Sequence, residues 1–445
     1  MAQAHDELAR YLERTPKSKS RWEEASKYLP GGDSRHSIYW DPYPIFITSA
    51  TGCHVVDADG VDRLDFINTM TTLILGHAAP PVMDAVQEQL TLGVAYNAPN
   101  EHQIRLARLL CQRIPSFDLV RFTNSGTEAT LNTIRAARAF TGKNRFAKIE
   151  GGYHGTHDAV TVSVRVDPEL AGDALRPRAV PNSAGLADGV LEQVTVIPFN
   201  ETEAAQRILE ENKEQLAAVI VEPVLGSAGM VAASAEFLSM LREFTRANGI
   251  ILIFDEVISF RVAPGGSQQY YGITPDLTSL GKIIGGGFPV GAFGGRQDIM
   301  ELYDPTKSAT VSHSGTFNAN PVTMLAGAVT LEQLTDEVYR DLAKLTDRLR
   351  QGIRDTCADM EVPVQVTGLG SLFGVHFSGN QIHNYRDMAT VDTNLQRQMF
   401  LGLMNEGILP ASNLVGVAFA PGGGLAVASN DPVSRLNVEI SPIRH

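Results

Sequence analysis

Short apolar runs alternate with amphipathic helical patterns through the middle of this 445-residue chain. The apolar runs are typical of strands buried on both faces, and they lie at residues 119–122, 146–149, 194–197, 216–221, 250–254 and 277–280. The helical pattern is clear at residues 235–248, where Phe237, Leu241 and Phe244 recur at helical spacing. Buried strands that alternate with helices form a mostly parallel sheet with helices on both faces. We therefore predict an α/β fold.

The length of the chain and the patterns at its two ends indicate two domains. A chain of 445 residues exceeds what one compact core normally holds. Residues 1–74 are predicted to form helices and a small antiparallel meander, residues 75–320 the large α/β domain, and residues 321–445 a connecting helix and further parts of the small domain. The connecting helix is predicted to run from residue 321 to 358, whereas residues 411–445 show no helical period. We expect a small α+β domain built from both chain ends.

Charge and composition exclude several classes of function. The net charge of −13 provides no basic surface for nucleic acid or for an anionic membrane. No apolar run approaches the roughly 20 residues of a membrane span, and the polar N-terminus has no signal-peptide pattern. The three scattered cysteines favour a reducing compartment. We expect a cytoplasmic protein that binds small molecules.

One candidate anion site follows the first buried run. The strand at 119–122 leads into Asn124-Ser125-Gly126-Thr127-Glu128, and a helical pattern begins there. Free N–H groups at a helix N-terminus attract an anion, Gly126 allows close approach, and the hydroxyls of Ser125 and Thr127 add donors. The alternative is an ordinary capping box formed by Ser125 and Glu128.

Two ionisable residues follow other apolar runs. Asp255 ends a buried strand, at the sheet edge where such folds bind ligands, and a buried carboxylate requires a cation nearby. Lys282 lies between an apolar run and the glycines at 285–287, where desolvation would lower its pKa and make it nucleophilic. The alternatives are an aspartate that caps the next turn and a surface lysine.

The glycine-rich stretches do not match nucleotide-binding loops. Ile283 follows Lys282 where a P-loop requires serine or threonine, and the glycines at 368–370 have the wrong spacing for a dinucleotide loop. Gly152-Tyr153-His154-Gly155 provides a ring that could stack on a flat cofactor, or a packing aromatic in a loop. His154 and His157 have no supporting carboxylate or cysteine cluster, so we predict no metal site.

Six motifs occur in order along the chain. They are Asn124-Ser125-Gly126-Thr127-Glu128-Ala129, Gly152-Tyr153-His154-Gly155, Val221-Glu222-Pro223, Phe254-Asp255-Glu256-Val257, the stretch 280–287 around Lys282, and His313-Ser314-Gly315-Thr316-Phe317. Together they resemble the class III aminotransferases that depend on pyridoxal 5′-phosphate (PLP), in the branch that contains glutamate-1-semialdehyde aminomutase. The resemblance covers residues 28–408. It implies the aspartate aminotransferase-like architecture, fold type I, with PLP as cofactor.

The resemblance implies a role for each matching residue. Lys282 would form the imine with PLP and move the proton during transfer, and Asp255 would keep the pyridine nitrogen protonated. The remaining implied contacts with PLP are Ser125, Gly126 and Thr127 at the phosphate, Tyr153 and Val257 on the two ring faces, and His154 and Glu222 beside the ring. Thr316 would complete the phosphate site of the neighbouring subunit, so the active unit would be a homodimer.

The likeness extends to the substrate side at one position. Arg35 follows Pro30-Gly31-Gly32-Asp33-Ser34, where β-amino acid aminotransferases of the β-phenylalanine type carry the arginine that binds the substrate carboxylate. The alternative is a solvated loop arginine. A second arginine of those enzymes, used for α-carboxylates, is missing here, because no arginine follows residue 408 until Arg435. The usual closing strand and helix after residue 411 are not recognisable either.

Three functions remain for this sequence. The first is an aminotransferase that moves an amino group from a β-amino acid, or a related amine, to a keto acid such as 2-oxoglutarate or pyruvate. The second is an aminomutase that moves the amino group within one molecule. The third, a binding protein with a PLP-enzyme fold and no activity, is disfavoured because both Lys282 and Asp255 are present.

Overall fold

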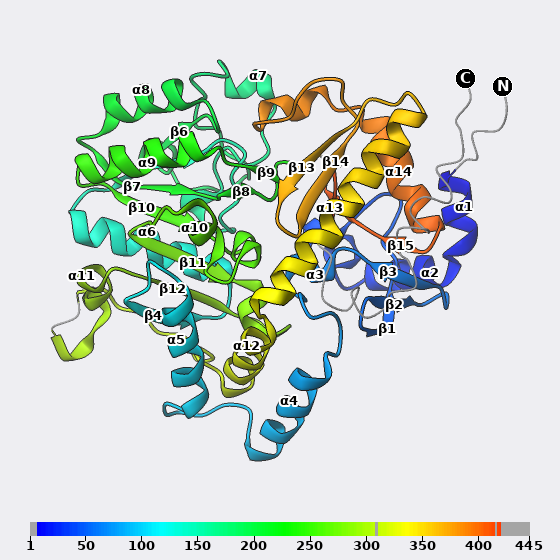
Figure 1. Ribbon diagram of the computed structural model, residues 1–445, viewed down its shortest axis with the longest axis horizontal. Helices are drawn as coiled ribbons and strands as arrows, with labels where there is room; N and C mark the ends of the chain where they lie inside the picture. The colour runs from blue at the N-terminus through cyan, green and yellow to red at the C-terminus, as the bar shows by residue number, and fades with distance from the viewer. Residues whose placement is uncertain (1–6, 308–309, 414–415, 420–445) are drawn as a thin grey trace. The chain divides into compact units, whose positions relative to one another are not determined.

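The computed structural model describes residues 7–307, 310–413 and 416–419 (Figure 1). The chain forms two compact units. The large unit contains residues Pro80–Tyr339 and the short segment His383–Asp387, and the small unit contains the other described residues. No helix among the described residues is both long enough and apolar enough to cross a membrane.

A seven-stranded sheet forms the centre of the large unit, with the strand order β4-β12-β11-β10-β7-β5-β6. Strand β12 is antiparallel to both of its neighbours, and the other neighbouring pairs are parallel. The predicted mostly parallel α/β sheet is therefore confirmed. The strands are β4 (Leu119–Thr123), β5 (Arg145–Ile149), β6 (Val194–Ile197), β7 (Leu216–Val221), β10 (Ile251–Asp255), β11 (Leu277–Gly281) and β12 (Gly291–Gly295), and β8 (Val224–Leu225) and β9 (Val231–Ala232) form a separate ribbon.

Strand β12 was not predicted from the sequence. Its sequence, Gly-Ala-Phe-Gly-Gly, lacks the β-branched residues that mark the other strands. The neighbouring backbone explains the glycines, because a Cβ at Gly295 would lie 2.2 Å from the carbonyl oxygen of Asp276 and one at Gly294 2.5 Å from that of Leu119. Close backbone approach, rather than local propensity, selects glycine here.

Helices cover both faces of this sheet. Helix α6 packs on one face, where its apolar side chains share a core with Phe146, Ile220 and Ile253. Alternate residues of the same strands point to the opposite face, and α9 packs there with α8 beside it (Figure 1). The longer helices are α4 (Pro80–Leu92), α5 (Glu101–Arg113), α6 (Gly126–Thr141), α8 (Thr202–Asn212), α9 (Ala235–Ala247) and α12 (Pro321–Gln333), and the short ones α7 (Pro168–Ala171), α10 (Gly266–Tyr271) and α11 (Gln297–Met300).

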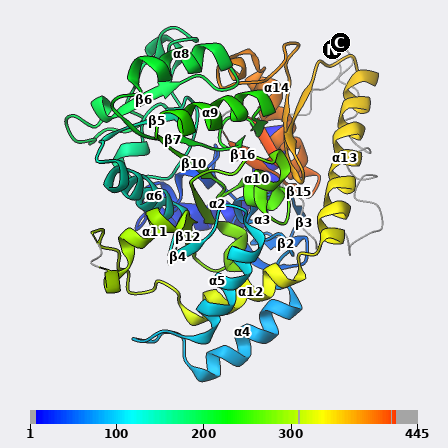
Figure 2. The same cartoon turned by 60° about the vertical axis from the view of Figure 1, so that its left-hand side comes forward.

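The predicted single helix over residues 321–358 is two helices. Helix α12, which packs against α4 and α5 (Figure 2), ends at Gln333, and α13 (Asp336–Asp359) begins three residues later. Leu334 leaves the helical conformation with ψ at 81° and is buried. Thr335 accepts a hydrogen bond from the N–H of Val338, and acidic residues follow it. Thr335 and these acidic residues form the N-terminal signal of a helix, but the apolar spacing continues across them and predicted one helix.

Two four-stranded sheets form the small unit, in the orders β1-β2-β3-β15 and β13-β14-β17-β16. The predicted meander is present, although its first strand begins at Ile47 rather than at residue 45. The elements are α1 (Glu7–Arg14), α2 (Pro16–Ala25), β1 (Ile47–Thr51), β2 (His54–Asp57), β3 (Asp62–Asp65), α3 (Asn68–Thr71), β13 (Gln365–Leu369), β14 (Leu372–His376), α14 (Thr393–Asn405), β15 (Ile408–Leu409), β16 (Ala411–Asn413) and β17 (Gly416–Phe419).

Strands β16 and β17 correct the expectation for the C-terminal stretch, in which the sequence shows no recognisable closing strand. They pair antiparallel with each other, and β17 also pairs with β14. Long-range pairing with β14 completes this sheet, and a local pattern could not reveal it. The rest of the stretch, including Arg435, lies outside the described residues.

Candidate active site

Neighbouring strands of the large sheet bring Asp255, Lys282 and Glu222 to one edge. Asp255 is the last residue of β10 and pairs with Ser279 of β11. Lys282 directly follows the end of β11, and Glu222 directly follows β7, whose Val221 pairs with Phe254. Because parallel strands end at the same edge, the carboxyl edge of the sheet collects all three side chains, as predicted for a ligand site in this type of fold.

The N-terminus of α6 begins with a capping box. Ser125 Oγ accepts a hydrogen bond from the N–H of Glu128 at 3.2 Å, and Glu128 Oε2 accepts one from the N–H of Asn124 at 2.7 Å. The capping interpretation of this motif is therefore correct. It leaves room for an anion, because the first-turn N–H groups of Gly126 and Thr127 have no partner within the helix.

Val257 joins this helix terminus to the strand ends. A Cβ at Gly126 would lie 3.0 Å from both methyl groups of Val257, and one at Gly281 would lie 3.2 Å from Cγ1. Only glycine at both positions lets Val257 pack between the start of α6 and the residue before Lys282. The α6 N-terminus, which is the candidate phosphate site, and Lys282 therefore lie on either side of the Val257 side chain.

The loop after β5 lies against the same helix. Tyr153 donates its backbone N–H to Glu222 Oε1 at 2.7 Å, and Thr130 Oγ1 donates to the carbonyl oxygen of His154 at 2.5 Å. A Cβ at Gly155 would lie 2.5 Å from Thr127 Oγ1, so the loop contacts the first turn of α6 directly. The Tyr153 side chain is 41% exposed. A large aromatic ring therefore faces open space at the carboxyl edge of the sheet.

His154 and Asp255 form a buried pair. His154 Nδ1 lies 2.8 Å from Asp255 Oδ2, and the N–H of Val257 donates to Oδ1 at 3.1 Å. Burial lowers the pKa of His154, although the carboxylate acts in the opposite direction. A neutral ring that donates from Nδ1 stabilises the ionised form of Asp255. His154 Nε2 has no hydrogen-bond partner among the described residues.

Lys282 combines a strained backbone with an unengaged ammonium. Its φ of +53° lies in the left-handed region that residues other than glycine rarely adopt. Its side chain makes no hydrogen bond with a described residue. Burial lowers the pKa of Lys282, whereas the charges of Asp255 and Glu222 act in the opposite direction. A lowered pKa increases the unprotonated fraction of the amine, which is the form that can attack a carbonyl carbon. Strain and desolvation together favour a chemical role over a surface one.

Two of the residues predicted for the site, Arg35 and Thr316, lie on exposed segments. Arg35 belongs to the small unit, where it is exposed and its N–H donates to Asp33 Oδ1 at 2.5 Å. Thr316 lies in an exposed segment that precedes α12, and the neighbouring Phe317 is 60% exposed. Neither side chain forms a hydrogen bond or ion pair with a described residue.

An anchor on the loop before Tyr153 was not predicted from the sequence. Arg386 forms a two-pronged ion pair with Glu150, with both N–O distances 2.8 Å. The ring of Tyr385 packs over Gly151, where a Cβ would lie 2.7 Å from it. Arg386 is 236 residues from Glu150 in the sequence, so no local pattern signals the contact. The anchor holds the chain that leads into the Tyr153 loop.

The group fits PLP in each of its parts. A helix N-terminus suits the phosphate, an ionised Asp255 suits a protonated pyridine nitrogen, and the open face of Tyr153 suits a flat ring. The unengaged Nζ of Lys282, in its unprotonated form, suits an aldehyde carbon. No group of three or more histidine, cysteine, aspartate or glutamate side chains in the described part of the chain is arranged to hold a metal ion.

Comparisons with known proteins agree with this chemistry. The sequence model described as aminotransferase class-III matches residues 38–419. The chain is 43% identical to the glutamate-1-semialdehyde 2,1-aminomutase of Methanothermobacter thermautotrophicus over 88% of its length and 91% of the relative's.

Solved structures share the fold over nearly the whole chain. An omega-transaminase from Sphaerobacter thermophilus is 44% identical with a TM-score of 0.88, covering 93% of this chain and 94% of that one. A β-phenylalanine aminotransferase from Variovorax paradoxus is 36% identical with a TM-score of 0.85, covering 97% and 95%. A transaminase with PLP bound is 34% identical with a TM-score of 0.85, covering 95% and 96%. The chain has fold type I, depends on PLP, and belongs to the class-III aminotransferase family.

Proposed function

We propose that this protein is an aminotransferase that moves an amino group from a β-amino acid, or a related amine with a carboxylate, to a keto acid. The observation that carries the choice of donor is Arg35, which follows Ser34 and presents an exposed guanidinium that makes no ion pair with a described residue. Such a group is available to bind a carboxylate through two parallel hydrogen bonds. The omega-transaminase and the β-phenylalanine aminotransferase among the similar structures support the same class of donor.

Bound PLP supplies an electron sink that stabilises negative charge on the carbon next to the transferred nitrogen. Lys282 Nζ would hold PLP in the resting protein and, once freed by the amino donor, would move the proton between the donor carbon and the cofactor within each half-reaction. Asp255 keeps a negative charge opposite the pyridine nitrogen, and His154 Nδ1–H stabilises this charge. Glu222 fixes the Tyr153 backbone, and the Tyr153 ring covers one face of the site while Val257 packs against the other.

A panel of amino donors and acceptors tests the proposal. The purified protein is mixed with PLP, one donor and 2-oxoglutarate or pyruvate, and both products are measured. Transfer from a β-amino acid with parallel lines in a double-reciprocal plot is expected, because the two substrates take turns at one site. If no donor yields a new amino acid from any keto acid, the proposed reaction is excluded.

Replacing Arg35 with alanine separates carboxylate recognition from chemistry. The Arg35→Ala variant is expected to raise KM for a carboxylate-bearing β-amino acid by roughly 10- to 100-fold, the loss of about 1.5–3 kcal/mol for a hydrogen bond to a charged group. KM for an amine without a carboxylate is expected to change little. Arg35→Lys keeps the charge but loses the planar guanidinium. Its KM for the β-amino acid is expected to lie between the values of the wild type and of Arg35→Ala. Unchanged KM for both substrates would remove Arg35 from the site.

An aminomutase is the second candidate, and the 43% identity to a glutamate-1-semialdehyde 2,1-aminomutase favours it. In that reaction the amino group moves within one molecule, so no keto acid is consumed. Glutamate-1-semialdehyde incubated with the protein and PLP separates the two. Formation of its amino-shifted isomer without any keto acid, together with no transfer to 2-oxoglutarate or pyruvate, would replace our first proposal with this one.

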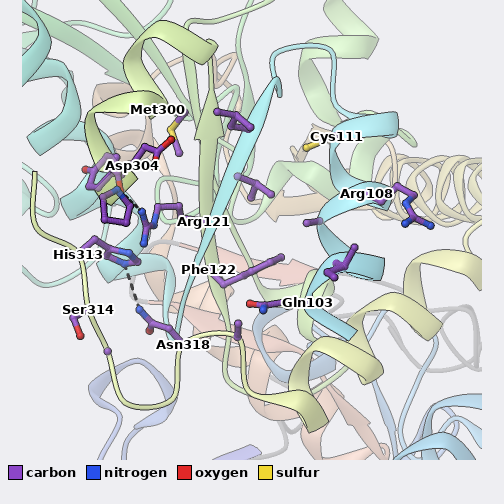
Figure 3. A pocket seen from close by; sticks show the side chains of 18 residues that line it. Gln103, Arg108, Cys111, Arg121, Phe122, Met300, Asp304, His313, Ser314 and Asn318 are labelled. Carbon is purple, nitrogen blue, oxygen red and sulfur yellow. Dashed lines mark hydrogen bonds between the residues drawn. The ribbon is translucent and has the colours of Figure 1, made fainter. Parts of the chain in front are cut away.

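We also propose that the active unit is a homodimer. A cleft of about 800 Å³ on the large unit lies between α5 and the segment that precedes α12 (Figure 3). Two of its apolar side chains, Ile104 and Leu119, are 48% and 43% exposed, and Ser314 and Gly315 line it beside exposed Thr316. Single exposed apolar residues are common, but a cleft rimmed by them is typical of a binding surface. A second copy of the chain would cover this face and receive Thr316 at its phosphate site.

Mixed dimers test the role of Thr316 directly. Thr316→Ala is expected to raise the PLP dissociation constant by roughly tenfold, the loss of one hydrogen bond to a charged phosphate. A Lys282→Ala subunit paired with a Thr316→Ala subunit then contains one intact site if Thr316 serves its neighbour, and none if it serves its own subunit. Recovery of activity at limiting PLP after the two inactive preparations are mixed is the expected result. Thr316→Ser, which keeps the hydroxyl, is the control, and sedimentation gives the oligomeric state.

A further inference from the structure

Three acidic residues lie side by side at the carboxyl edge of the large sheet. Glu150 directly follows β5, Glu222 directly follows β7, and Asp255 ends β10. The register pairs Ile220 of β7 with Lys148 of β5 on one side and with Ile253 of β10 on the other. Two residues further along each strand, the three acids therefore form one row. They point to the face covered by α6, as Ile220 and Ile253 do.

Buried carboxylates require compensating positive charge, and two members of this row have an evident partner. All three acids are nearly inaccessible, with exposed fractions of 2%, 3% and 4% for Glu150, Glu222 and Asp255. Glu150 is paired with Arg386. Asp255 accepts the His154 N–H and is the expected partner of the pyridine nitrogen. Glu222 accepts two backbone N–H groups, from Tyr153 at 2.7 Å and from Gly226 at 3.3 Å, and neither carries a charge. The charge of Lys282 also acts on Glu222, but Lys282 is the group expected to react with PLP.

Lys148 is a buried cation close to this row that forms no direct ion pair with a described residue. It lies in β5 and is fully buried. Its ammonium donates a hydrogen bond to the carbonyl oxygen of Ile149 at 3.0 Å, and no carboxylate oxygen of a described residue lies within 4.0 Å. Lys148 points to the α6 face because it pairs with Ile220, so Glu222 is its diagonal neighbour, within reach of a long side chain. Glu150 is on the same face but already has Arg386.

We propose that Lys148 is the counter-charge of Glu222 and acts, through Glu222, as a positioning residue for Tyr153. The proposal rests on the proposed function only in that Tyr153 is taken to cover the PLP ring. Removal of the ammonium leaves a buried carboxylate without charge compensation, and this carboxylate holds the Tyr153 backbone. In a site with little access to water, attraction acts over distances longer than a direct ion pair.

The titration behaviour of the neighbouring groups is consistent with this coupling. Burial lowers the pKa of Lys148 to about 7, and the charges of Glu222 and Glu150 act in the opposite direction. Burial raises the pKa of Glu222 to about 8, and the negative charge of Asp255 adds to this effect. Burial thus favours the uncharged form of each group, and the attraction of Glu222 acts against this at Lys148. The charge of Lys148 also lowers the pKa of His154, in the same direction as burial.

A double-mutant cycle tests the pairing. Lys148→Met removes the ammonium and keeps the length of the side chain, and Glu222→Gln removes the negative charge but keeps an oxygen that can accept the Tyr153 N–H. Each single variant leaves one buried charge unpaired, so each is expected to raise the PLP dissociation constant by about tenfold or more and to lower the melting temperature of the cofactor-free protein. In the double variant, the losses of PLP affinity and of melting temperature are expected to be much smaller than the sums of the losses in the two single variants.

Additive losses in both measurements would overturn the proposal, because they would show that the two side chains act independently. The visible circular dichroism of bound PLP provides a signal that general destabilisation does not move. It is expected to weaken in Lys148→Met and to recover in the double variant. If neither single variant folds, a double variant that folds supports the pairing, and one that does not fold contradicts it.

Lys143→Met is the matched control, because the ammonium of Lys143 bonds to the backbone oxygen of Lys213. It is expected to leave PLP binding and melting temperature unchanged, and a tenfold change there would contradict the assignment to Lys148. PLP binding needs no turnover. A protein that binds PLP but transfers no amino group would therefore exclude the proposed function and leave the cycle a valid test of this pairing.

Discussion

Lys282→Ala is expected to abolish amino transfer while PLP still binds. Loss of the only group proposed to take the proton from the substrate carbon removes both nucleophilic and acid–base catalysis, so kcat is expected to fall by roughly 10⁴-fold or more. PLP binding is expected to survive, because the α6 N-terminus, Asp255 and Tyr153 are unchanged. Single-turnover absorbance of the bound cofactor, followed after addition of the amino donor, measures the rate.

The Lys282 test has two controls. Lys344→Ala removes a lysine whose side chain is 77% exposed, and it is expected to leave kcat unchanged. A small primary amine added to Lys282→Ala is expected to restore part of the rate, because a free amine can accept the proton that Nζ no longer accepts. A Lys282→Ala variant that keeps full activity would contradict the assignment of this residue.

Asp255→Asn is expected to lower kcat by roughly 10²- to 10⁴-fold with little change in fold. The amide has nearly the same shape and still accepts the His154 Nδ1–H, but it carries no charge to hold the pyridine nitrogen protonated. The reason the effect is large lies in the burial of Asp255, which is 4% exposed, so no solvent replaces the lost charge. Stopped-flow kinetics of each half-reaction measure the loss.

Asp255→Glu and His154→Asn separate charge from geometry in this pair. The glutamate variant keeps the charge at a shifted position and is expected to retain more activity than Asp255→Asn. The His154→Asn variant keeps a hydrogen-bond donor near Asp255. Its kcat is expected to fall less than that of either Asp255 variant, since His154 acts only through the carboxylate. Equal losses in Asp255→Asn and Asp255→Glu would show that position, rather than charge, governs the rate. Wild-type kcat in Asp255→Asn would exclude the proposed role.

The strands that face helices on both sides could be predicted from the sequence because their local composition matches their environment. Strand β7 has the bounds expected from its apolar run, β10 is shifted by one residue at both ends, and β11 is one residue longer at its end. Strand β12 could not be predicted, because its glycines are selected by the carbonyl of Asp276, which precedes β11, and by that of Leu119, which begins β4. The break between α12 and α13 was missed because apolar spacing continues across Leu334 while its backbone turns away from the helix.

The site residues also divide into those that local sequence reveals and those that depend on distant parts of the chain. The chemistry of Lys282, Asp255 and Gly126 can be inferred from the sequence, because each lies directly beside a strand or helix terminus. The pairing of Glu150 with Arg386 joins residues 236 apart, so it became visible only in the folded chain. Lys148 carried a signal that was overlooked, since a lysine inside an apolar strand must find a partner or remain uncharged.

The sequence by itself determined the sheet class and the motif order, and it pointed to the groups proposed to hold PLP. These features depend on local composition and on the spacing of residues next to strand ends. Only the tertiary structure decided which buried charges face one another, because the register of β5, β7 and β10 places Glu150, Glu222 and Asp255 in one row. Register is a property of paired strands rather than of either strand alone. The partner of a buried charge is therefore set by the assembled sheet.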